Sequence, residues 1–194
     1  MSVFEFRPQG IYCPQGDFYI DPWRPVERAL ITHGHSDHAR YGSKKYLCTE
    51  LAAPVIRHRL GEVKIETIPY EKEININGVR ISFHPAGHVP GSAQILAEIK
   101  GERWVVSGDY KVVYDGLSTP FEPIKCHSFI SECTFGLPAF NWLPQKEIFK
   151  EINNWWLQCN REGITPVFAA YGLGTAQRLL SGIDNSIGPI LTHG

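Results

Sequence analysis

The stretch Ala29-Leu30-Ile31-Thr32-His33-Gly34-His35-Ser36-Asp37-His38 places four side chains that can bind metal within six residues, directly after a short apolar strand. Neutral imidazoles and carboxylates are ligands suited to zinc. In an extended segment His33 and His35 point to the same side, so both can bind one ion. The loop that follows can direct Asp37 and His38 toward a second ion. A lone histidine is more often a hydrogen-bonded core residue, but this density of ligands after a strand predicts a metal site.

Short strands are predicted over the first hundred residues, because brief apolar runs rich in Val, Ile and Phe are bounded by Gly, Pro and Asn. Asn77-Gly78, between alternating apolar residues in 74–83, predicts a tight hairpin. A second hairpin is expected where 95–99 and 104–107 flank Lys100-Gly101-Glu102. Further strands are predicted at 18–21, 29–32 and 129–131.

The sequence predicts a short helix early in the chain and a long one after residue 144. Residues 51–60 predict a short helix that Pro54 limits to its last two turns. From Ile148 to Cys159, apolar residues recur at intervals of three and four, which predicts one long amphipathic helix after Pro144. A strand at 166–170, a helix from 172 to 180 and a strand at 189–192 are then expected. This alternation is typical of the start of an α/β unit, so we place a domain boundary at 140/141, with domains over 1–140 and 141–194.

Composition sets limits on function. The chain has 194 residues, of which 43% are hydrophobic and 20% charged, and its formal net charge is −1. This composition is typical of a soluble globular protein with one core, or one core and part of a second. The near-zero charge argues against nucleic-acid binding by a bulk positive field, so any such binding must rest on a local site. Five scattered cysteines predict reduced thiols in the cytoplasm, and neither a signal peptide nor a membrane span is expected.

The string H-x-H-x-D-H resembles the signature of the metallo-β-lactamase fold, and three further motifs match in the expected order. Asp21 in Tyr19-Ile20-Asp21-Pro22 resembles the first, structural aspartate of that family. His88 in Pro85-Ala86-Gly87-His88 resembles the third-motif histidine, and Asp109 in Ser107-Gly108-Asp109 resembles the aspartate that bridges two metals. The resemblance implies the α/β fold class, with an αββα sandwich of which 1–140 is the N-terminal part. It also implies two zinc sites, with Mn²⁺ as an alternative metal: the first held by His33, His35 and His88, the second by Asp37 and His38, and Asp109 between them.

The segment Ser131-Glu132-Cys133-Thr134-Phe135-Gly136, the amphipathic helix and residues 168–178 resemble the acidic motif and the start of the β-CASP insertion. That insertion occurs in nucleic-acid-processing members, including Artemis-like DNA nucleases, messenger-RNA 3′-end processing factors and bacterial ribonuclease J. Within this group, 16–26 and 31–40 most resemble the bacterial ligase-associated DNA exonucleases. Diiron members typically carry Glu where this chain has His35, which argues against redox chemistry.

The resemblance implies hydrolysis of phosphodiester bonds in nucleic acid, DNA rather than RNA, by an exonuclease of repair or end processing, with a DNA ligase or other repair proteins as partners. Asp37 would orient or deprotonate the attacking water, and Glu132 would accept an N–H from a ligand imidazole. Any nucleic-acid contact is expected along a basic strip near the metals, although a solvated face explains such a strip about equally well. The strip consists of Arg40, Lys44, Lys45, Arg57 and Arg59.

Two other interpretations remain open. A small-molecule hydrolase of the thioesterase type would use the same pair of metals without a nucleic-acid groove, and a non-catalytic fragment would bind metal without turnover. β-CASP enzymes supply two late histidine motifs after the insertion, and neither is found up to Gly194. We therefore expect an N-terminal portion of a longer enzyme, with an incomplete second metal site and weak or no activity when isolated.

Overall fold

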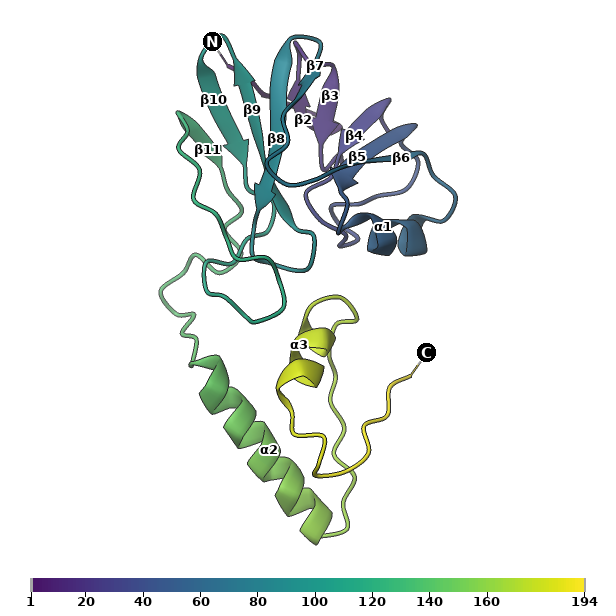
Figure 1. The fold of residues 1–194 in the computed structure, drawn as a ribbon, viewed down its shortest axis with the longest axis vertical. Helices are drawn as coiled ribbons and strands as arrows, with labels where there is room; N and C mark the ends of the chain where they lie inside the picture. Colours follow the sequence, from purple (N-terminus) through teal and green to yellow (C-terminus); the bar gives the residue numbers. More distant parts are fainter. Residues whose placement is uncertain (1, 194) are drawn as a thin grey trace. The chain divides into compact units, whose positions relative to one another are not determined.

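The computed structural model describes residues 2–193 and separates into two compact units, Met1–Cys133 and Thr134–Gly194. The division falls ahead of the change of pattern that the sequence places at residue 140. Within residues 2–193, the first unit holds two β-sheets and one helix, and the second holds two helices (Figure 1). Each unit is described by itself.

A six-stranded sheet forms one layer of the first unit, in the order β1-β2-β3-β4-β5-β6. The first three strands pair antiparallel, and β3 to β6 pair parallel. The parallel half contains β4, whose carboxyl end leads directly into the histidine-rich loop. The strands are β1 (Glu5–Arg7), β2 (Gly10–Cys13), β3 (Phe18–Ile20), β4 (Arg28–Leu30), β5 (Lys45–Thr49) and β6 (Ile65–Ile68).

A five-stranded sheet, in the order β11-β10-β9-β8-β7, forms the second layer. Both predicted hairpins are present. Asn77 and Gly78 have positive φ angles of 51° and 85°, the conformation of a two-residue turn that matches the twist of its strands. Lys100 and Gly101 make the second such turn, and Glu102 already belongs to the following strand. The strands are β7 (Ile74–Ile76), β8 (Val79–Pro85), β9 (Ala93–Ile99), β10 (Glu102–Val106) and β11 (Ser128–Ile130).

Alternation along the strands builds two apolar cores. Leu30 and Leu47 face the five-stranded sheet and pack in one cluster with Phe18, Ile81 and Ile95. Their neighbours Ala29, Ile31, Tyr46 and Cys48 point to the opposite face, where they pack against α1 (Ala53–Leu60). The first unit is therefore an α/β sandwich in which helix, sheet and sheet follow one another. Pro54 lies in the first turn of α1, where its missing N–H has no helical partner to lose.

The second unit contains α2 (Gln145–Arg161) and α3 (Thr175–Gly182), close to the predicted bounds. Trp156 and Cys159 are the buried residues of α2, and the ring of Phe149 lies against the Cα of Gly182 in α3. The strands predicted at 166–170 and 189–192 are not formed. Apolar content alone favoured them, but a strand exists only when its backbone hydrogen-bonds to a neighbouring strand, and none pairs with them within 2–193.

No helix within residues 2–193 combines the length and the apolar character needed to cross a membrane.

Candidate metal centre

The ends of three strands bring the predicted ligands together. The loop after β4 carries His33, His35, Asp37 and His38. The turn after β8 carries His88, and the turn after β10 carries Asp109. Because β4 belongs to one sheet and β8 and β10 to the other, the group lies where the two layers of the first unit meet.

One ligand atom from each of His33, His35, His88 and Asp109 lies within 4.8 Å of the other three. His35 Nδ1 is 2.9 Å from His33 Nε2 and 3.3 Å from His88 Nε2. Asp109 Oδ2 is 3.4 Å from His88 Nε2 and 3.8 Å from His33 Nε2. Four ligands at about 2.1 Å from a tetrahedral zinc ion are about 3.4 Å apart, so these donors fit a zinc-sized ion.

A second set of donors lies on the other side of Asp109. Its Oδ1 atom is 3.2 Å from His38 Nε2, which in turn is 3.7 Å from Oδ2 of Asp37. The two oxygens of Asp109 thus face different imidazoles, the geometry that a bridging carboxylate requires. The side chain of Asp37 is 68% exposed, which leaves the second set more open than the first.

Hydrogen bonds around the cluster select which ring nitrogens face it. His38 Nδ1 donates to Oδ2 of Asp21 over 2.7 Å, which leaves Nε2 directed at Asp109. The hydroxyl of Thr32 donates to the same carboxylate over 2.5 Å and lies 3.1 Å from Nδ1 of His33. Thr32 is a buried residue that the sequence analysis treated only as the end of a strand. Its position directly before the first ligand was the available signal.

Burial and neighbouring charge set opposite protonation preferences within the cluster. Burial lowers the pKa of His33, and the charge of His38 lowers it further, so His33 is neutral as a metal ligand must be. Burial alone would lower the pKa of His38, but its hydrogen bonds to Asp109 and Asp21 raise it to about 10. Burial would raise the pKa of Asp109, yet the hydrogen bond from His38 and the nearby imidazoles lower it. Asp109 is therefore ionised.

A glycine makes the approach of Asp109 possible. Gly108 has φ +55°, and a Cβ atom there would lie 2.5 Å from Oγ1 of Thr32. The chain can thus place Asp109 beside His33 and His38 only because this neighbour has no side chain.

Burial lowers the pKa of His88, the charge of Asp109 opposes this effect, and the charge of Glu132, which follows β11, opposes it more weakly. Glu132 is therefore close enough to His88 to act on it electrostatically.

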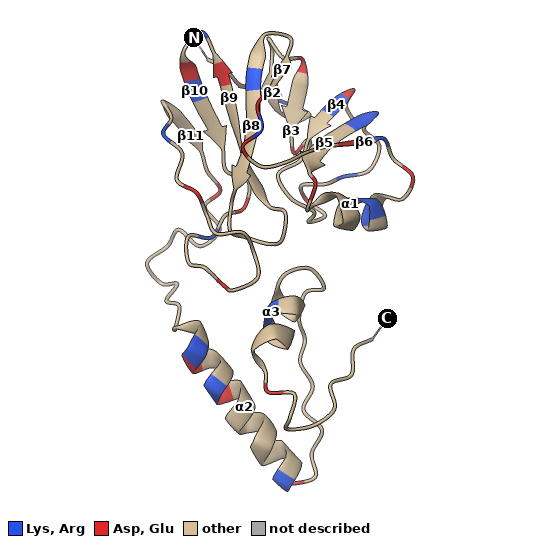
Figure 2. Cartoon of the chain, viewed as in Figure 1, with Lys and Arg blue, Asp and Glu red and all other residues tan. Residues whose placement is uncertain are grey.

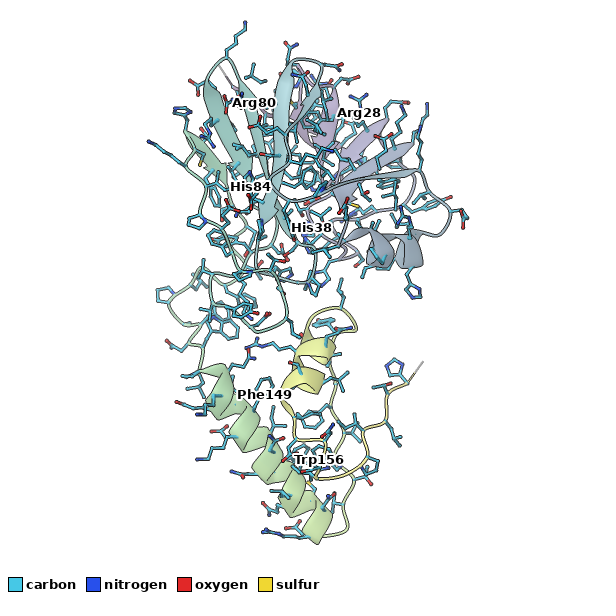
Figure 3. The ribbon with its side chains drawn as sticks, viewed as in Figure 1. Arg28, His38, Arg80, His84, Phe149 and Trp156 are labelled. Carbon is cyan, nitrogen blue, oxygen red and sulfur yellow. The ribbon has the colours of Figure 1, made fainter. Side chains whose placement is uncertain are left out.

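The predicted basic strip is not one strip near the cluster. In the parallel pairing of β4 and β5, Lys45 lies opposite Arg28, at the strand ends remote from the histidine loop. Figure 2 shows basic residues, in blue, at these ends of the strands. Figure 3 shows Arg28 and His38 well apart in the same unit. Lys44 forms an ion pair with Glu27 over 2.6 Å. The expectation was wrong for these two lysines because residues adjacent in sequence to the loop start the next parallel strand at its far end.

Two of the arginines of the strip bind the histidine loop itself. Arg40 Nε donates to the carbonyl of Asp37 over 3.1 Å, and Arg59 Nη1 donates to the carbonyl of Gly34 over 2.6 Å. Arg57 is an exposed residue of α1.

Sequence comparison finds relatives along nearly the whole chain, although no family model matches it. A "Probable DNA ligase" from Opitutus terrae is 30% identical over 188 residues, which are 95% of this chain and 18% of that protein. "Cleavage and polyadenylation specificity factor subunit 3" from Dictyostelium discoideum is 32% identical over 126 residues, 62% of this chain and 16% of that protein. An "RNase J-like protein" from Methanocaldococcus jannaschii is 26% identical over 197 residues, 84% of this chain and 45% of that protein.

The chain belongs to the metallo-β-lactamase-fold hydrolases of the β-CASP nuclease group. As a member of that family it carries the His and Asp cluster that could hold a divalent metal. The chain spans less than half the length of these relatives, between 16% and 45% of each. Among solved structures, a metallo-β-lactamase variant from Cronobacter sakazakii matches this chain with a TM-score of 0.41 and 14% sequence identity. The match covers 53% of this chain and 58% of the Cronobacter chain.

Proposed function

We propose that this chain forms the metal-binding part of a zinc-dependent exonuclease that hydrolyses phosphodiester bonds in DNA. The observation that carries the proposal is the arrangement around Asp109, whose Oδ2 atom lies against the first histidine set and whose Oδ1 atom lies against His38. One carboxylate between two sets of nitrogen and oxygen donors suits a pair of divalent ions. Mn²⁺ is an alternative metal for the same oxygen and nitrogen ligands.

When bound, two such ions would neutralise charge on the phosphate in the transition state and lower the pKa of an attacking water. The chain's own residues would hold this arrangement in place. Asp109 would set the separation of the two ions, and Asp21 and Thr32 would hold His38 and His33 with Nε2 facing inward. Asp37, the most open acid of the cluster, would orient the water or accept its proton. Glu132 would act on His88 from outside the cluster by accepting its N–H.

The choice of DNA is supported by the relative named as a probable DNA ligase, which matches 95% of this chain. The relatives named for polyadenylation and as RNase J-like match 62% and 84% of it. We propose on the same ground that a DNA ligase or another repair protein is the partner. We place the protein in the cytoplasm, the compartment that its scattered cysteines predict. Of the predicted strip, we retain Arg57, an exposed residue of α1, as a proposed phosphate contact.

The test compares cleavage of end-labelled single- and double-stranded DNA, matched RNA and a thioester, with zinc or Mn²⁺ added to the chelator-treated protein. Zinc content is measured alongside activity. His35→Ala removes a ligand of the first set, and Asp37→Ala removes the open acid while leaving that set intact.

We expect at most weak shortening of DNA from an end, because the second metal site is incomplete in this chain, and both substitutions should reduce it. Cleavage of RNA alone would replace DNA by RNA as the substrate. Thioester hydrolysis without phosphodiester cleavage would establish the small-molecule hydrolase instead. Zinc binding with no turnover of any substrate would leave a non-catalytic metal-binding protein, and the absence of bound metal would end the proposal.

A further inference from the structure

Arg59 of α1 contacts the backbone near both ends of the histidine loop, residues 33–39. Arg59 Nη1 donates to the carbonyl of Gly34 over 2.6 Å and lies 3.5 Å from the carbonyl of Ala39. Gly34 stands between the two ligands His33 and His35, and Ala39 directly follows His38. One guanidinium nitrogen has two hydrogens, so it can donate to both carbonyls at once. The shorter contact is a charge-assisted hydrogen bond.

The helix that carries Arg59 is anchored by its packing in an apolar core. Its residues Ala53, Ile56 and Leu60 are buried in the cluster that also contains Tyr46 from β5. Ala39 is fully buried in the same cluster, so the loop leaves the metal centre by way of the helix's own packing surface. The charged end of Arg59 therefore extends from a packed element to a loop that begins and ends beside it.

Several other hydrogen bonds of the loop are short in range. The carbonyl of His35 accepts the N–H groups of His38 and Ala39, and Arg40 reaches back to the carbonyl of Asp37. These bonds shape the loop locally. Two longer connections join it to other parts of the unit: the side chain of His38 bonds to Asp21 after β3, and Arg59 of α1 holds the backbone at Gly34, 25 residues away in sequence.

We propose that Arg59 is a positioning residue of the metal centre, holding the backbone around His33 and His35 so that their ring nitrogens converge with His88 and Asp109. The inference rests on the metal site of the proposed function and not on the nature of the substrate. It also gives Arg59 a role other than the phosphate contact expected from its charge.

The charge of Arg59 and its hydrogen bonds to the loop predict opposite changes in metal affinity when Arg59 is replaced. A cation close to the cluster repels a divalent metal ion, so loss of its charge by itself would strengthen metal binding. Loss of its hydrogen bonds would loosen the loop and weaken metal binding. Arg59→Lys keeps the charge but lacks the planar guanidinium that can hold two carbonyls. Weaker binding in both Arg59→Ala and Arg59→Lys is therefore the mark of a positioning role.

The experiment measures zinc affinity by competition with a chelator, and the visible absorption of the Co²⁺-loaded protein, which reports the geometry of the ligands. The parent chain is compared with Arg59→Ala, Arg59→Lys and Lys64→Ala, the last being an exposed cation just after the same helix. Far-UV circular dichroism of the metal-free proteins checks that each variant folds. We expect a 10- to 100-fold loss of zinc affinity in Arg59→Ala, a smaller loss in Arg59→Lys, and altered Co²⁺ absorption in both. Lys64→Ala should match the parent in zinc affinity and Co²⁺ absorption.

Metal affinity and Co²⁺ absorption at parent values in Arg59→Ala would overturn the inference, as would tighter binding. If Arg59→Ala bound oligonucleotides more weakly but kept its metal affinity, Arg59 would be a phosphate contact and not a positioning residue. A parent chain that binds no metal would end both this inference and the proposed function. A parent that binds metal but cleaves no nucleic acid would end only the proposed function, because the comparison of metal affinities would still decide the role of Arg59.

Discussion

His38 Nδ1 lies 2.7 Å from Oδ2 of Asp21, a residue of a different turn and 17 positions earlier in the chain. The same carboxylate accepts the backbone N–H of Thr32 at 2.8 Å and its hydroxyl at 2.5 Å. Asp21 has φ +43°, a left-handed conformation that is unfavourable for a residue with a Cβ atom. Its three hydrogen bonds stabilise that conformation, and they couple the turn after β3 to the orientation of His38.

Replacement of Asp21 by asparagine should disturb the second metal position more than the first. The new amide must still accept from Thr32, so it presents N–H groups to His38 Nδ1 and favours the ring form that carries its proton on Nε2. That proton faces Asp109, where a metal would bind. We expect a 10- to 100-fold loss of affinity for the second metal equivalent, measured by zinc titration with a chelating indicator. An unchanged second equivalent would show that Asp21 does not orient His38.

Gly108→Ala should destabilise the protein through a clash with Thr32. The added Cβ would lie 2.5 Å from Oγ1 of Thr32 at a residue with φ +55°. We expect a loss of about 1–3 kcal/mol in the free energy of unfolding, as overpacking of a filled site typically gives. Gly101→Ala is the matched control, since Gly101 has φ +84° but no atom within 4 Å of its added Cβ. Urea unfolding should show a larger loss for Gly108→Ala, and equal losses would remove the clash as the cause.

Alkaline pH should reveal the buried thiol of Cys48. Burial raises the pKa of Cys48 to about 12 from an ordinary value of 9.0. In the unfolded chain the thiol ionises above about pH 9, whereas in the folded protein it stays protonated. Its contribution to stability is therefore fully present below pH 9 and is lost as the pH rises from 9 toward 12. Cys48→Ala should flatten the fall of the unfolding free energy over that window.

The control for this effect is Ile56→Val, which weakens the same apolar cluster by about 0.5–1.5 kcal/mol and keeps the thiol. It should lower stability at every pH without changing the slope. A slope as steep in Cys48→Ala as in the parent would assign the alkaline loss to other groups, among them Tyr70, whose pKa burial raises to about 12.

Local patterns predicted those parts of the fold that local chemistry decides. Asn77-Gly78 and Lys100-Gly101 form turns because their residues tolerate positive φ. The observed bounds of α2 are close to the predicted ones because its apolar residues recur regularly at helical spacing. The expected strands at 166–170 and 189–192 failed because pairing depends on a neighbour that no local pattern specifies. Periodicity identifies what a segment can form, and the partner determines whether it forms.

The same distinction applies to the metal centre. The string from His33 to His38 and the resemblance of His88 and Asp109 to family motifs brought together residues that the structure places side by side. The roles of Thr32 and Arg59 were missed, since hydrogen bonds to a carboxylate or a carbonyl depend on orientation in space. Lys44 and Lys45 were placed too close to the loop because sequence distance ignores the direction of a parallel strand.

Charge reversal of both lysines, Lys44→Glu with Lys45→Glu, should leave DNA affinity and its salt dependence nearly unchanged. Lys45 begins β5 at the end remote from the histidine loop, and Lys44 is paired with Glu27. If both contacted phosphates of a duplex, their loss would reduce the slope of log affinity against log salt by about 2. Fluorescence anisotropy with labelled duplex DNA over a salt series measures this slope. A change of that size would place the DNA path across the far end of β5.

Metal stoichiometry should separate the two halves of the cluster. His35 lies within 3.3 Å of two other donors of the four-atom set, whereas Asp37 is exposed and 3.7 Å from His38. We therefore expect about two zinc ions in the parent, one held tightly and one weakly. Asp37→Ala should retain the tight ion and lose the weak one, and His35→Ala should lose the tight ion. Atomic absorption after dialysis against buffers of graded free zinc measures both. Loss of the tight ion in Asp37→Ala with its retention in His35→Ala would exchange the roles of the two residues and move the primary site to the open side of Asp109.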